Sequence, residues 1–289
     1  MPEMPEVEIL ARHLRPLLRG KTIRGASVRR DRATRPTPPR DFEKAVAGLR
    51  IRDITRRGKY LLFQLEPRTE SRRMPKSGPT TLILLGHLGM TGRMFVALKK
   101  EKLPSHAAVV FNLGDRNFIY EDQRYLGRMT LDLSPLSELG PEPSDFSPET
   151  FAAALEQSRQ PIKIKLLDQS LIAGIGNIYA SEALFRARIS PKLAANRLTP
   201  AQAKSLLGAI GDVLNDAIKF GSTIQLKTMS GKSDALYYFS KDGERDYNKR
   251  FRVYDRAGQP CFNKCGSKIQ RITQGARSTY FCPHCQRTS

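Results

Sequence analysis

The first three residues of the chain place a secondary amine beside a carboxylate. Initiator methionine is normally removed before a small residue, so processing of Met1 would leave Pro2 at the N-terminus, next to Glu3. A free proline nitrogen can attack an aldehyde-like carbon and form an iminium, which is an electron sink. The adjacent carboxylate is placed to transfer protons. Many proteins begin with Met-Pro for no chemical reason, so this pair predicts covalent catalysis only together with other residues.

The four cysteines lie near the C-terminus in two short pairs, Cys261-x3-Cys265-x16-Cys282-x2-Cys285. Spacings of two to four residues within a pair are typical of tetrahedral zinc sites. Clustering of this kind favours a metal over disulfides, and four unrelated buried cysteines are the alternative. The pattern predicts one structural Zn²⁺ in a closed Cys₄ site. His284 can in principle replace a thiolate, but a spacer role is preferred.

Two segments in the second half of the chain are candidates for binding phosphate. Arg277 lies between the cysteine pairs, and its planar guanidinium suits phosphate oxygens. Residues 171–177 contain two glycines and end at Asn177. Exposed N–H groups at the start of the following helix would make an anion site, and the Asn177 side chain adds a donor. The alternatives are a solvated surface arginine and a plain turn between two helices.

A third candidate is the glycine-containing segment 87–93, with the sequence HLGMTGR. Met90 lies between Gly89 and Gly92 and has no obvious core to fill. An exposed, unbranched side chain of this kind can insert between stacked bases. The alternative is a methionine that packs beneath its own loop.

The charge of the chain indicates a polyanionic partner. Of its 289 residues, 49 are Lys or Arg and 28 are Asp or Glu, so the net charge is 49 − 28 = +21 with histidine neutral. This excess predicts nucleic acid as the first partner class and an anionic membrane surface as the second. No apolar run approaches the roughly 20 residues that span a bilayer. The N-terminus also lacks the features of a signal peptide, so we expect a cytoplasmic protein.

Hydrophobic periodicity divides the chain into elements that must position these residues. Apolar residues at helical spacing predict a helix over residues 6–19. Short strands separated by turn residues then predict a β-sandwich or barrel. We expect these strands at residues 22–28, 49–58, 60–65, 81–89, 93–98, 107–113, 117–123 and 128–133. The Pro-rich and charged segments 34–40 and 67–79 are expected to be mobile loops.

The second half of the chain is predicted to be mainly helical. Helical patterns cover residues 147–157, 162–172, 177–187 and 199–221, and the polar stretch 230–249 is expected to be a loop. The fold class is therefore α+β with two domains. We expect an N-terminal domain at residues 1–134, a linker at 135–147, a helical domain at 148–250 and a zinc finger at 251–289.

Five motifs in the same order make the chain similar to the formamidopyrimidine-DNA glycosylase (MutM-like, Fpg/Nei) family. They are MPEMPEVE at the start, RRGKYL at 56–61, HLGMTGR at 87–93, DQSLIAGIGNIYASE at 168–182 and RSTYFCPHCQ at 277–286. The resemblance covers the whole chain. It implies a β-sandwich joined to a helix–two-turn–helix domain and a zinc-finger hairpin. Met4 fits the purine-repair branch of the family better than the endonuclease VIII branch.

The resemblance implies a bifunctional DNA glycosylase and AP lyase of base excision repair. Pro2 would attack the deoxyribose C1′ and displace an oxidised purine, such as 8-oxoguanine or a formamidopyrimidine. Glu3 would act as the acid in ring opening, Lys59 would assist β-elimination and Arg277 would assist δ-elimination. Other implied residues are the DNA contacts His87, Met90, His106, Arg124, Asn177 and Arg159 (with Lys163 as an alternative to Arg159), and the supporting carboxylates Glu6 and Glu182.

The implied chemistry requires the damaged base to leave the stack. Met90 and Arg124 would fill the vacated space. The expected partner is double-stranded DNA with damaged bases, bound by a monomer associated with a bacterial nucleoid. A catalytically silent DNA-binding protein is a second class of function, although mere binding needs neither Pro2 nor Glu3. An endonuclease VIII-like glycosylase for oxidised pyrimidines is the alternative among enzymes.

The sequence departs from the family pattern at three places. Three residues separate Cys261 from Cys265 where two are usual, and zinc geometry tolerates this spacing. Leu126 stands where the purine branch usually has Phe, which puts the preference for the opposite base in doubt. The segment 223–247, which caps the flipped base in this family, matches poorly.

Overall fold

The computed structural model describes residues 2–67, 81–221 and 250–287. These residues form two compact units. One contains residues 2 and 6–137, and the other contains residues 3–5, 138–221 and 250–287. Each unit has its own hydrophobic core, and the two-domain α+β class is confirmed. Most of the predicted loop at 67–79, and the loops at 223–247 and 230–249, lie outside the described residues.

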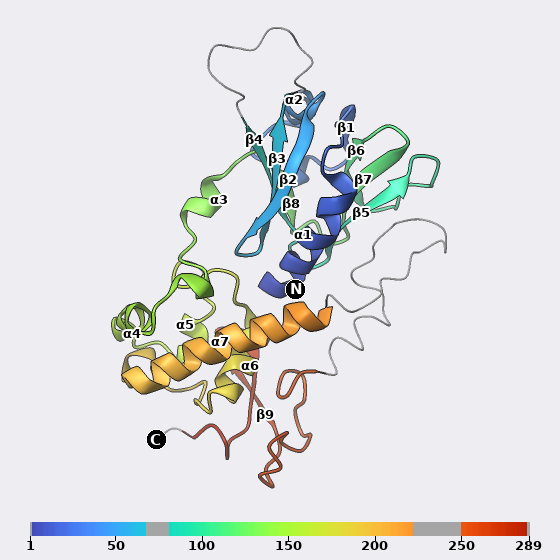
Figure 1. Ribbon diagram of the computed structural model, residues 1–289. Coiled ribbons are helices and arrows are strands. Elements are labelled where there is room, and N and C mark those ends of the chain that lie inside the picture. The colour runs from blue at the N-terminus through green and yellow to red at the C-terminus, as the bar shows by residue number, and fades with distance from the viewer. Residues whose placement is uncertain (1, 68–80, 222–249, 288–289) are drawn as a thin grey trace. The chain divides into compact units, whose positions relative to one another are not determined.

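The first unit contains two four-stranded sheets in which all neighbouring strands are antiparallel. One sheet has the order β1 (Gly25–Val28), β6 (Ala107–Asn112), β7 (Arg116–Asp122) and β5 (Gly92–Leu98). The other has the order β2 (Arg50–Arg57), β3 (Tyr60–Glu66), β4 (Leu82–His87) and β8 (Arg128–Thr130). Figure 1 shows these sheets beside α1 (Met4–Leu18). The predicted β-sandwich with a flanking helix is confirmed.

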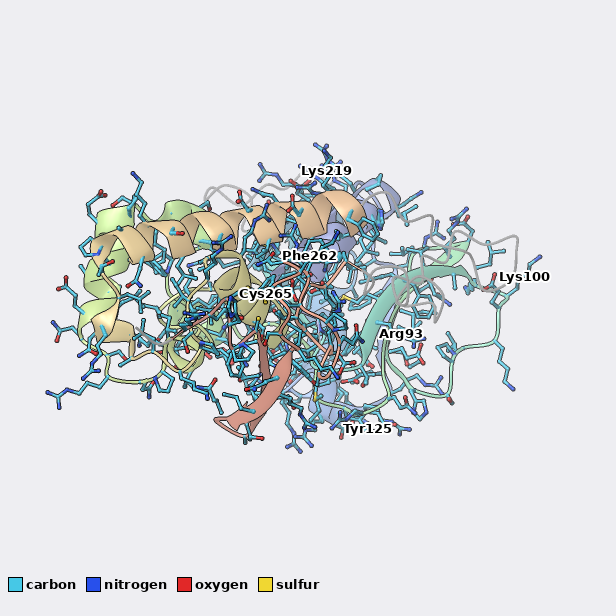
Figure 2. The ribbon with its side chains drawn as sticks, turned by 90° about the horizontal axis from the view of Figure 1, so that it is seen from below. Arg93, Lys100, Tyr125, Lys219, Phe262 and Cys265 are labelled. Atoms are coloured by element: carbon cyan, nitrogen blue, oxygen red, sulfur yellow. The ribbon has the colours of Figure 1, made fainter. Side chains whose placement is uncertain are left out.

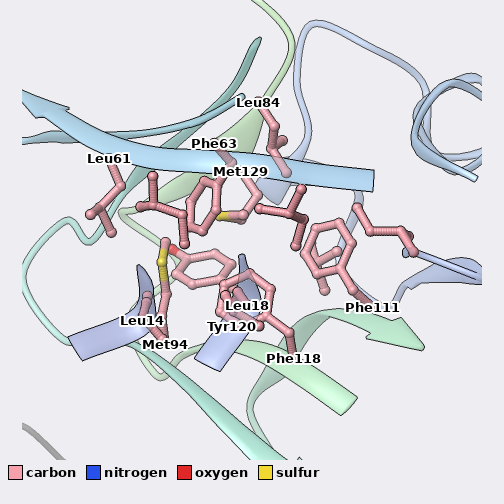
Figure 3. Close-up of a cluster of buried hydrophobic side chains, with 14 of the residues drawn as sticks. Leu14, Leu18, Leu61, Phe63, Leu84, Met94, Phe111, Phe118, Tyr120 and Met129 are labelled. Atoms are coloured by element: carbon pink, nitrogen blue, oxygen red, sulfur yellow. The ribbon is translucent and has the colours of Figure 1, made fainter. Parts of the chain in front are cut away.

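The core of this unit contains side chains from both sheets and from α1 (Figure 3). Every second residue of β3, namely Leu61, Phe63 and Leu65, is buried, as expected for a strand with one face on a core. The rings of Phe111 and Phe118 stack at 5.4 Å. Leu14 and Leu18, one helical turn apart on α1, are fully buried in the same core.

Residues 34–40 were predicted to form a mobile loop. This prediction is wrong for Pro39 and Arg40, which begin a helix, and for Thr34, which is buried. Helix α2 (Pro39–Val46) begins there with Pro39 at its first position, where the missing N–H costs nothing. Phe42 and Val46 lie one turn apart on this helix and are fully buried. Thr34 is also buried, and its hydroxyl donates to the Thr37 carbonyl oxygen at 3.1 Å. A short 3-10 turn, η1 (Asp31–Ala33), directly precedes Thr34.

The second unit is built on four helices and two short 3-10 turns. They are α4 (Pro148–Glu156), α5 (Ile162–Lys165), α6 (Asn177–Arg186), α7 (Pro200–Gly221), η2 (Pro143–Asp145) and η3 (Ala195–Arg197). The short helix α3 (Ser134–Ser137) belongs to the first unit and ends it. Ser147 caps α4 by accepting a hydrogen bond from Thr150 N at 3.2 Å. The helix predicted over 162–172 ends at Lys165, because turns occupy the following residues.

A two-stranded hairpin completes this unit near the C-terminus. It consists of β9 (Gln270–Gln274) and β10 (Arg277–Phe281). The two residues of its turn, Gly275 and Ala276, have φ values of 53° and 57°. Positive φ at both positions is typical of a type I′ hairpin turn. Within the described residues, no helix has the length and apolar character needed to cross a membrane.

Candidate active site

Glu3 lies at the N-terminus of α6 and is 1% exposed. Its carboxylate accepts hydrogen bonds from Ile178 N at 2.9 Å and from Tyr179 N at 3.2 Å. The first N–H groups of a helix have no partner within the helix, and the helix dipole favours an anion there. The anion site predicted at this helix start is therefore occupied by the protein's own carboxylate. This contact fixes the residue that follows Pro2.

The turn before α6 leaves room for Glu3 only because residue 176 is glycine. A Cβ atom on Gly176 would lie 2.3 Å from the Glu3 carboxyl carbon. The Gln169 side chain stabilises this turn through two hydrogen bonds to its backbone. Its amide group donates to the Ile175 carbonyl oxygen at 2.8 Å and accepts from Gly174 N at 3.0 Å. The Gly174 carbonyl oxygen in turn accepts from Met4 N at 3.0 Å. Gly176 thus allows this turn to pack closely against the first residues of the chain.

A fully buried lysine joins α5, α6 and the C-terminal hairpin. Lys163 has no exposed surface. Its ammonium group donates to Asn177 Oδ1, to Thr279 Oγ1 at 2.9 Å and to the Ser278 carbonyl oxygen at 3.2 Å. The Asn177 amide also donates to the Ser278 carbonyl oxygen, at 3.0 Å. Lys163 therefore positions the hairpin that carries Arg277, and its own side chain is not at the surface.

Burial lowers the pKa of Lys163 to about 8. The positive charge of Arg277 adds to this decrease, and the negative charge of Glu3 opposes it. A buried ammonium is tolerated only where hydrogen bonds and an opposite charge compensate its lost hydration. Glu3 and Arg277 thus act in opposite directions on the charge of Lys163 within one unit.

The two arginines proposed to meet a DNA backbone from this unit are both exposed. Arg277 is the first residue of β10, directly after the hairpin turn, where its guanidinium is free to contact a ligand. Arg159 follows α4 in an exposed segment. Of the two alternatives Arg159 and Lys163, only Arg159 presents its side chain to solvent.

The four cysteine sulfur atoms lie within 4.8 Å of one another. The Sγ–Sγ distances are 3.8 Å between Cys261 and Cys285 and 3.5 Å between Cys265 and Cys282. A tetrahedral zinc with Zn–S bonds of about 2.3 Å requires sulfurs about 3.8 Å apart. The residues therefore fit a Cys₄ zinc site, with Phe262 beside Cys265 in the same loop (Figure 2). His284 is exposed, as expected for a spacer.

In the first unit, Lys59 lies in the two-residue turn between β2 and β3. Gly58, the other turn residue, has a φ of 56°, which glycine adopts without strain. Arg56 fastens this turn, because its guanidinium donates to the Gly58 carbonyl oxygen at 2.9 Å and to Glu8 on α1 at 3.0 Å. Although burial acts in the opposite direction, hydrogen bonds from Arg12 and Arg56 lower the pKa of Glu8.

His87 is the last residue of β4, and its ring lies 4.8 Å from the ring of Tyr60. Gly89 N donates to His87 Nδ1 at 3.2 Å. Burial lowers the pKa of His87 to about 4, and the charges of Lys59 and Arg128 add to the decrease. At neutral pH the ring is thus uncharged, and its Nε2–H group is a hydrogen-bond donor.

Two neighbouring loops carry the exposed residues proposed for insertion into DNA. Met90 is 43% exposed and Arg124 is also exposed. The expected alternative for Met90, packing beneath its own loop, is therefore wrong. His106 Nδ1 lies 3.3 Å from the Tyr125 hydroxyl, and the Arg30 guanidinium lies 5.4 Å from the Tyr125 ring centroid.

The supporting carboxylates Glu6 and Glu182 are both buried. Glu6 lies in the first turn of α1. Glu182 accepts three backbone hydrogen bonds, from Arg252 N at 2.9 Å, Val253 N at 3.0 Å and Tyr254 N at 2.8 Å. This carboxylate thus holds the segment that leads into the cysteine module. Lys163 and Asp122 are also buried charged residues, and no positioning role was predicted for either from the sequence. A charged residue inside an otherwise apolar or β pattern is the signal that could have found them.

Three family models match consecutive parts of the chain. The formamidopyrimidine-DNA glycosylase N-terminal domain matches residues 1–129, the formamidopyrimidine-DNA glycosylase H2TH domain matches residues 139–228, and the zinc finger found in FPG and IleRS matches residues 258–288. Two curated relatives are called formamidopyrimidine-DNA glycosylase. The protein from Chloroflexus aurantiacus is 43% identical over all of this chain and 98% of its own length. The protein from Symbiobacterium thermophilum is 39% identical over 99% of this chain and 89% of its own length.

Solved structures of formamidopyrimidine-DNA glycosylases are also similar to this chain. A Lactococcus lactis formamidopyrimidine-DNA glycosylase, non-covalently bound to DNA containing an AP site, has a TM-score of 0.82 and 29% identity over 99% of this chain and all of that chain. A complex of the LlFpg protein with THF-DNA and an inhibitor has a TM-score of 0.82 and 31% identity over the same shares.

Proposed function

This chain belongs to the formamidopyrimidine-DNA glycosylase family, and we propose that it removes oxidised purines from double-stranded DNA and then cleaves the strand as an AP lyase. The family membership makes it a DNA glycosylase of base excision repair. The substrate class and the lyase activity are the proposed parts. The observation that carries the proposal is the pairing of Pro2 with a Glu3 carboxylate that is fixed by two N–H groups of α6.

The first chemical step forms a bond between the Pro2 nitrogen and C1′ of the damaged nucleotide. Removal of Met1 frees this nitrogen. Attack at C1′ breaks the glycosidic bond and the base leaves with a proton; when the C1′–O4′ bond of the sugar then breaks, the nitrogen lone pair forms an iminium at C1′. Glu3 is the candidate for protonating the sugar ring oxygen as the ring opens. The iminium then makes the C2′ hydrogen acidic.

The elimination steps need bases, acids and phosphate contacts. We assign the β-elimination of the 3′ phosphate to Lys59 at the tip of the β2–β3 turn, and the δ-elimination of the 5′ phosphate to Arg277 at the tip of the hairpin. His87 donates from Nε2 as a neutral ring, a suitable contact for a phosphate oxygen. Asn177, His106, Arg124 and Arg159 are the further proposed DNA contacts.

The cysteine cluster is proposed to hold one Zn²⁺ through Cys261, Cys265, Cys282 and Cys285. When bound, the ion supplies folding energy to the hairpin and no open coordination position for catalysis. The chain's own contribution is positional, since the cysteines flank the strands that carry Arg277. The curated relatives share the formamidopyrimidine-DNA glycosylase name, which favours oxidised purines over the endonuclease VIII-like alternative.

Trapping with borohydride tests the mechanism directly. The protein is incubated with duplexes that contain 8-oxoguanine or thymine glycol, and the iminium is reduced to a stable amine. We expect a covalent protein–DNA adduct mainly with 8-oxoguanine, and N-terminal sequencing of the free protein should begin at Pro2. Protein that retains Met1 should form no adduct. Strand incision by protein with a blocked N-terminal nitrogen would refute the mechanism.

A further inference from the structure

Asp122, the last residue of β7, is a buried carboxylate without a role in the proposed chemistry. Its Oδ1 atom accepts from Thr91 Oγ1 at 2.7 Å and from Arg124 N at 3.1 Å. Its Oδ2 atom accepts from Gly127 N at 2.8 Å and from the Tyr120 hydroxyl at 3.3 Å. Hydrogen bonds to an ionised acceptor are stronger than those between neutral groups. This side chain is therefore a strong local anchor.

Three of these donors tie together two loops, residues 88–91 between β4 and β5 and residues 123–127 between β7 and β8, which we call the insertion loops. The fourth donor, Tyr120, lies on β7 itself. Thr91 belongs to the first loop, and its hydroxyl also accepts from Arg124 N at 3.2 Å in the second. The backbones are in contact as well. A Cβ atom on Gly89 would lie 2.5 Å from Gly127 N. The two loops thus form one packed body around the Asp122 carboxylate.

Each insertion loop presents one large apolar side chain to solvent. Met90 and Leu126 are both 43% exposed, and the residues that the structure describes include only three other large hydrophobic side chains of comparable exposure. Tyr125, which precedes Leu126 in the second loop, has a φ of 54°. An exposed apolar side chain on a fixed backbone is suited to enter a base stack, because ordering it there costs little additional entropy.

We propose that Asp122 is a positioning residue for base flipping, which holds both insertion loops so that Met90 and Leu126 enter the duplex as one unit. The inference rests on the proposed function. A carboxylate is required, because an asparagine would direct its NH₂ group at two of the donors. The hydroxyls of Thr91 and Tyr120 can rotate to accept from it, but the N–H groups of Arg124 and Gly127 cannot. One backbone anchor is lost whichever way the amide turns.

The test compares excision of one lesion in two duplexes. In the first the lesion is fully paired, and in the second it is unpaired in a bulge, where less unstacking is needed. We expect Asp122→Asn to lower kcat/KM on the paired lesion by roughly tenfold to 100-fold. On the bulged lesion the loss should stay below about threefold, because the unstacking cost is smaller. Asp115→Asn is the matched control, since Asp115 is an exposed acid on the same unit and its loss changes the charge equally.

Two further variants separate positioning from a general loss of stability. Thr91→Val keeps the carboxylate and removes only the hydroxyl that bridges the loops, so it should show the same preference for the bulged lesion with a smaller loss. Met90→Ala and Asp122→Asn should be non-additive, because part of the effect of Asp122 is exerted through the Met90 side chain. Equal losses on both duplexes, or additive effects, would overturn the inference alone. A wild-type protein inactive on both duplexes would overturn the proposed function, and this inference with it.

Discussion

At the scale of single residues, His87 shows how the fold selects one protonation state. Gly89 N donates to Nδ1, so this nitrogen must carry a lone pair. Protonation of Nδ1 would direct its hydrogen at the hydrogen of the Gly89 N–H group. It would also add a positive charge near the positive charges of Lys59 and Arg128. Burial and these two charges lower the pKa to about 4, while Asp122 opposes the decrease. The ring therefore stays neutral throughout the physiological pH range.

This shift predicts acid sensitivity of the fold. Between pH 6.5 and 4 the unfolded chain binds a proton at His87 that the folded protein does not, so the free energy of unfolding falls as the pH decreases through this window. The loss should reach about 1–3 kcal/mol. Denaturant titrations at several pH values should show a shallower pH dependence for His87→Gln. Zinc release affects both proteins alike, so the difference isolates His87, and identical slopes would contradict the assignment.

The sequence was sufficient to predict which residues could have a functional role, but not the groups with which they form hydrogen bonds. Pro2, Glu3 and the cysteines are conspicuous by chemistry and spacing alone. Glu3, however, binds N–H groups of residues 178 and 179, and no local pattern indicates a partner so distant in sequence. The same limit applied to Lys163, which looks like a surface cation in the sequence. Its burial follows from the packing of α5 against a hairpin more than 100 residues later.

At the scale of elements, prediction succeeded where one face of an element is buried. The alternation in β3 and the four-residue spacing on α1 both follow from this geometry. Helix α2 was missed because its Pro-rich start suggests a loop, although Phe42 and Val46 are spaced by one helical turn. The helix predicted over 162–172 was too long. Asp168 there caps a turn by accepting from Ser170 N at 3.0 Å, a local bond that competes with the helix.

The zinc-finger hairpin packs on a small buried cluster, so we expect its fold to depend on the metal. Among the described residues, this cluster contains Phe185, Val253, Ile269 and Tyr280 with Cys261 and Cys282, and the partly buried Tyr254, Cys265 and Cys285 pack against it. We expect Cys282→Ser to abolish zinc binding and to weaken binding of an abasic-site duplex by roughly 100-fold, because Arg277 loses its fixed position. Zinc content and affinity are measured together, and the helical circular dichroism signal should persist.

A neighbouring substitution controls for disturbance of the same loop. Phe262 lies between Cys261 and Cys265 and is 54% exposed, with the Arg252 guanidinium 4.7 Å from its ring centroid. Phe262→Ala removes this surface contact and leaves all four sulfurs in place, so zinc content should be unchanged and affinity should change by less than about threefold. Retention of both zinc and affinity in Cys282→Ser would refute a structural metal site.

At the scale of the whole molecule, the net charge of +21 supplies attraction to DNA that is independent of sequence. Each phosphate neutralised by a cation releases counterions, so the logarithm of the binding constant falls with the logarithm of salt concentration by about 0.9 per contact. The exposed Arg277 is one proposed phosphate contact, whereas the buried Lys163 has no surface from which to make one. The charge total alone does not distinguish these two cations.

The salt dependence of binding therefore assigns the role of Arg277. Arg277→Ala should reduce the slope measured on an abasic-site duplex by about one, in addition to weakening the binding. Arg50→Gln is the control, because Arg50 is already ion-paired with Glu66 across β2 and β3. This substitution removes the same charge from the molecule and should leave the slope nearly unchanged. Equal slope changes in the two variants would show that Arg277 acts only through the overall field of the protein, and not by contact with a phosphate.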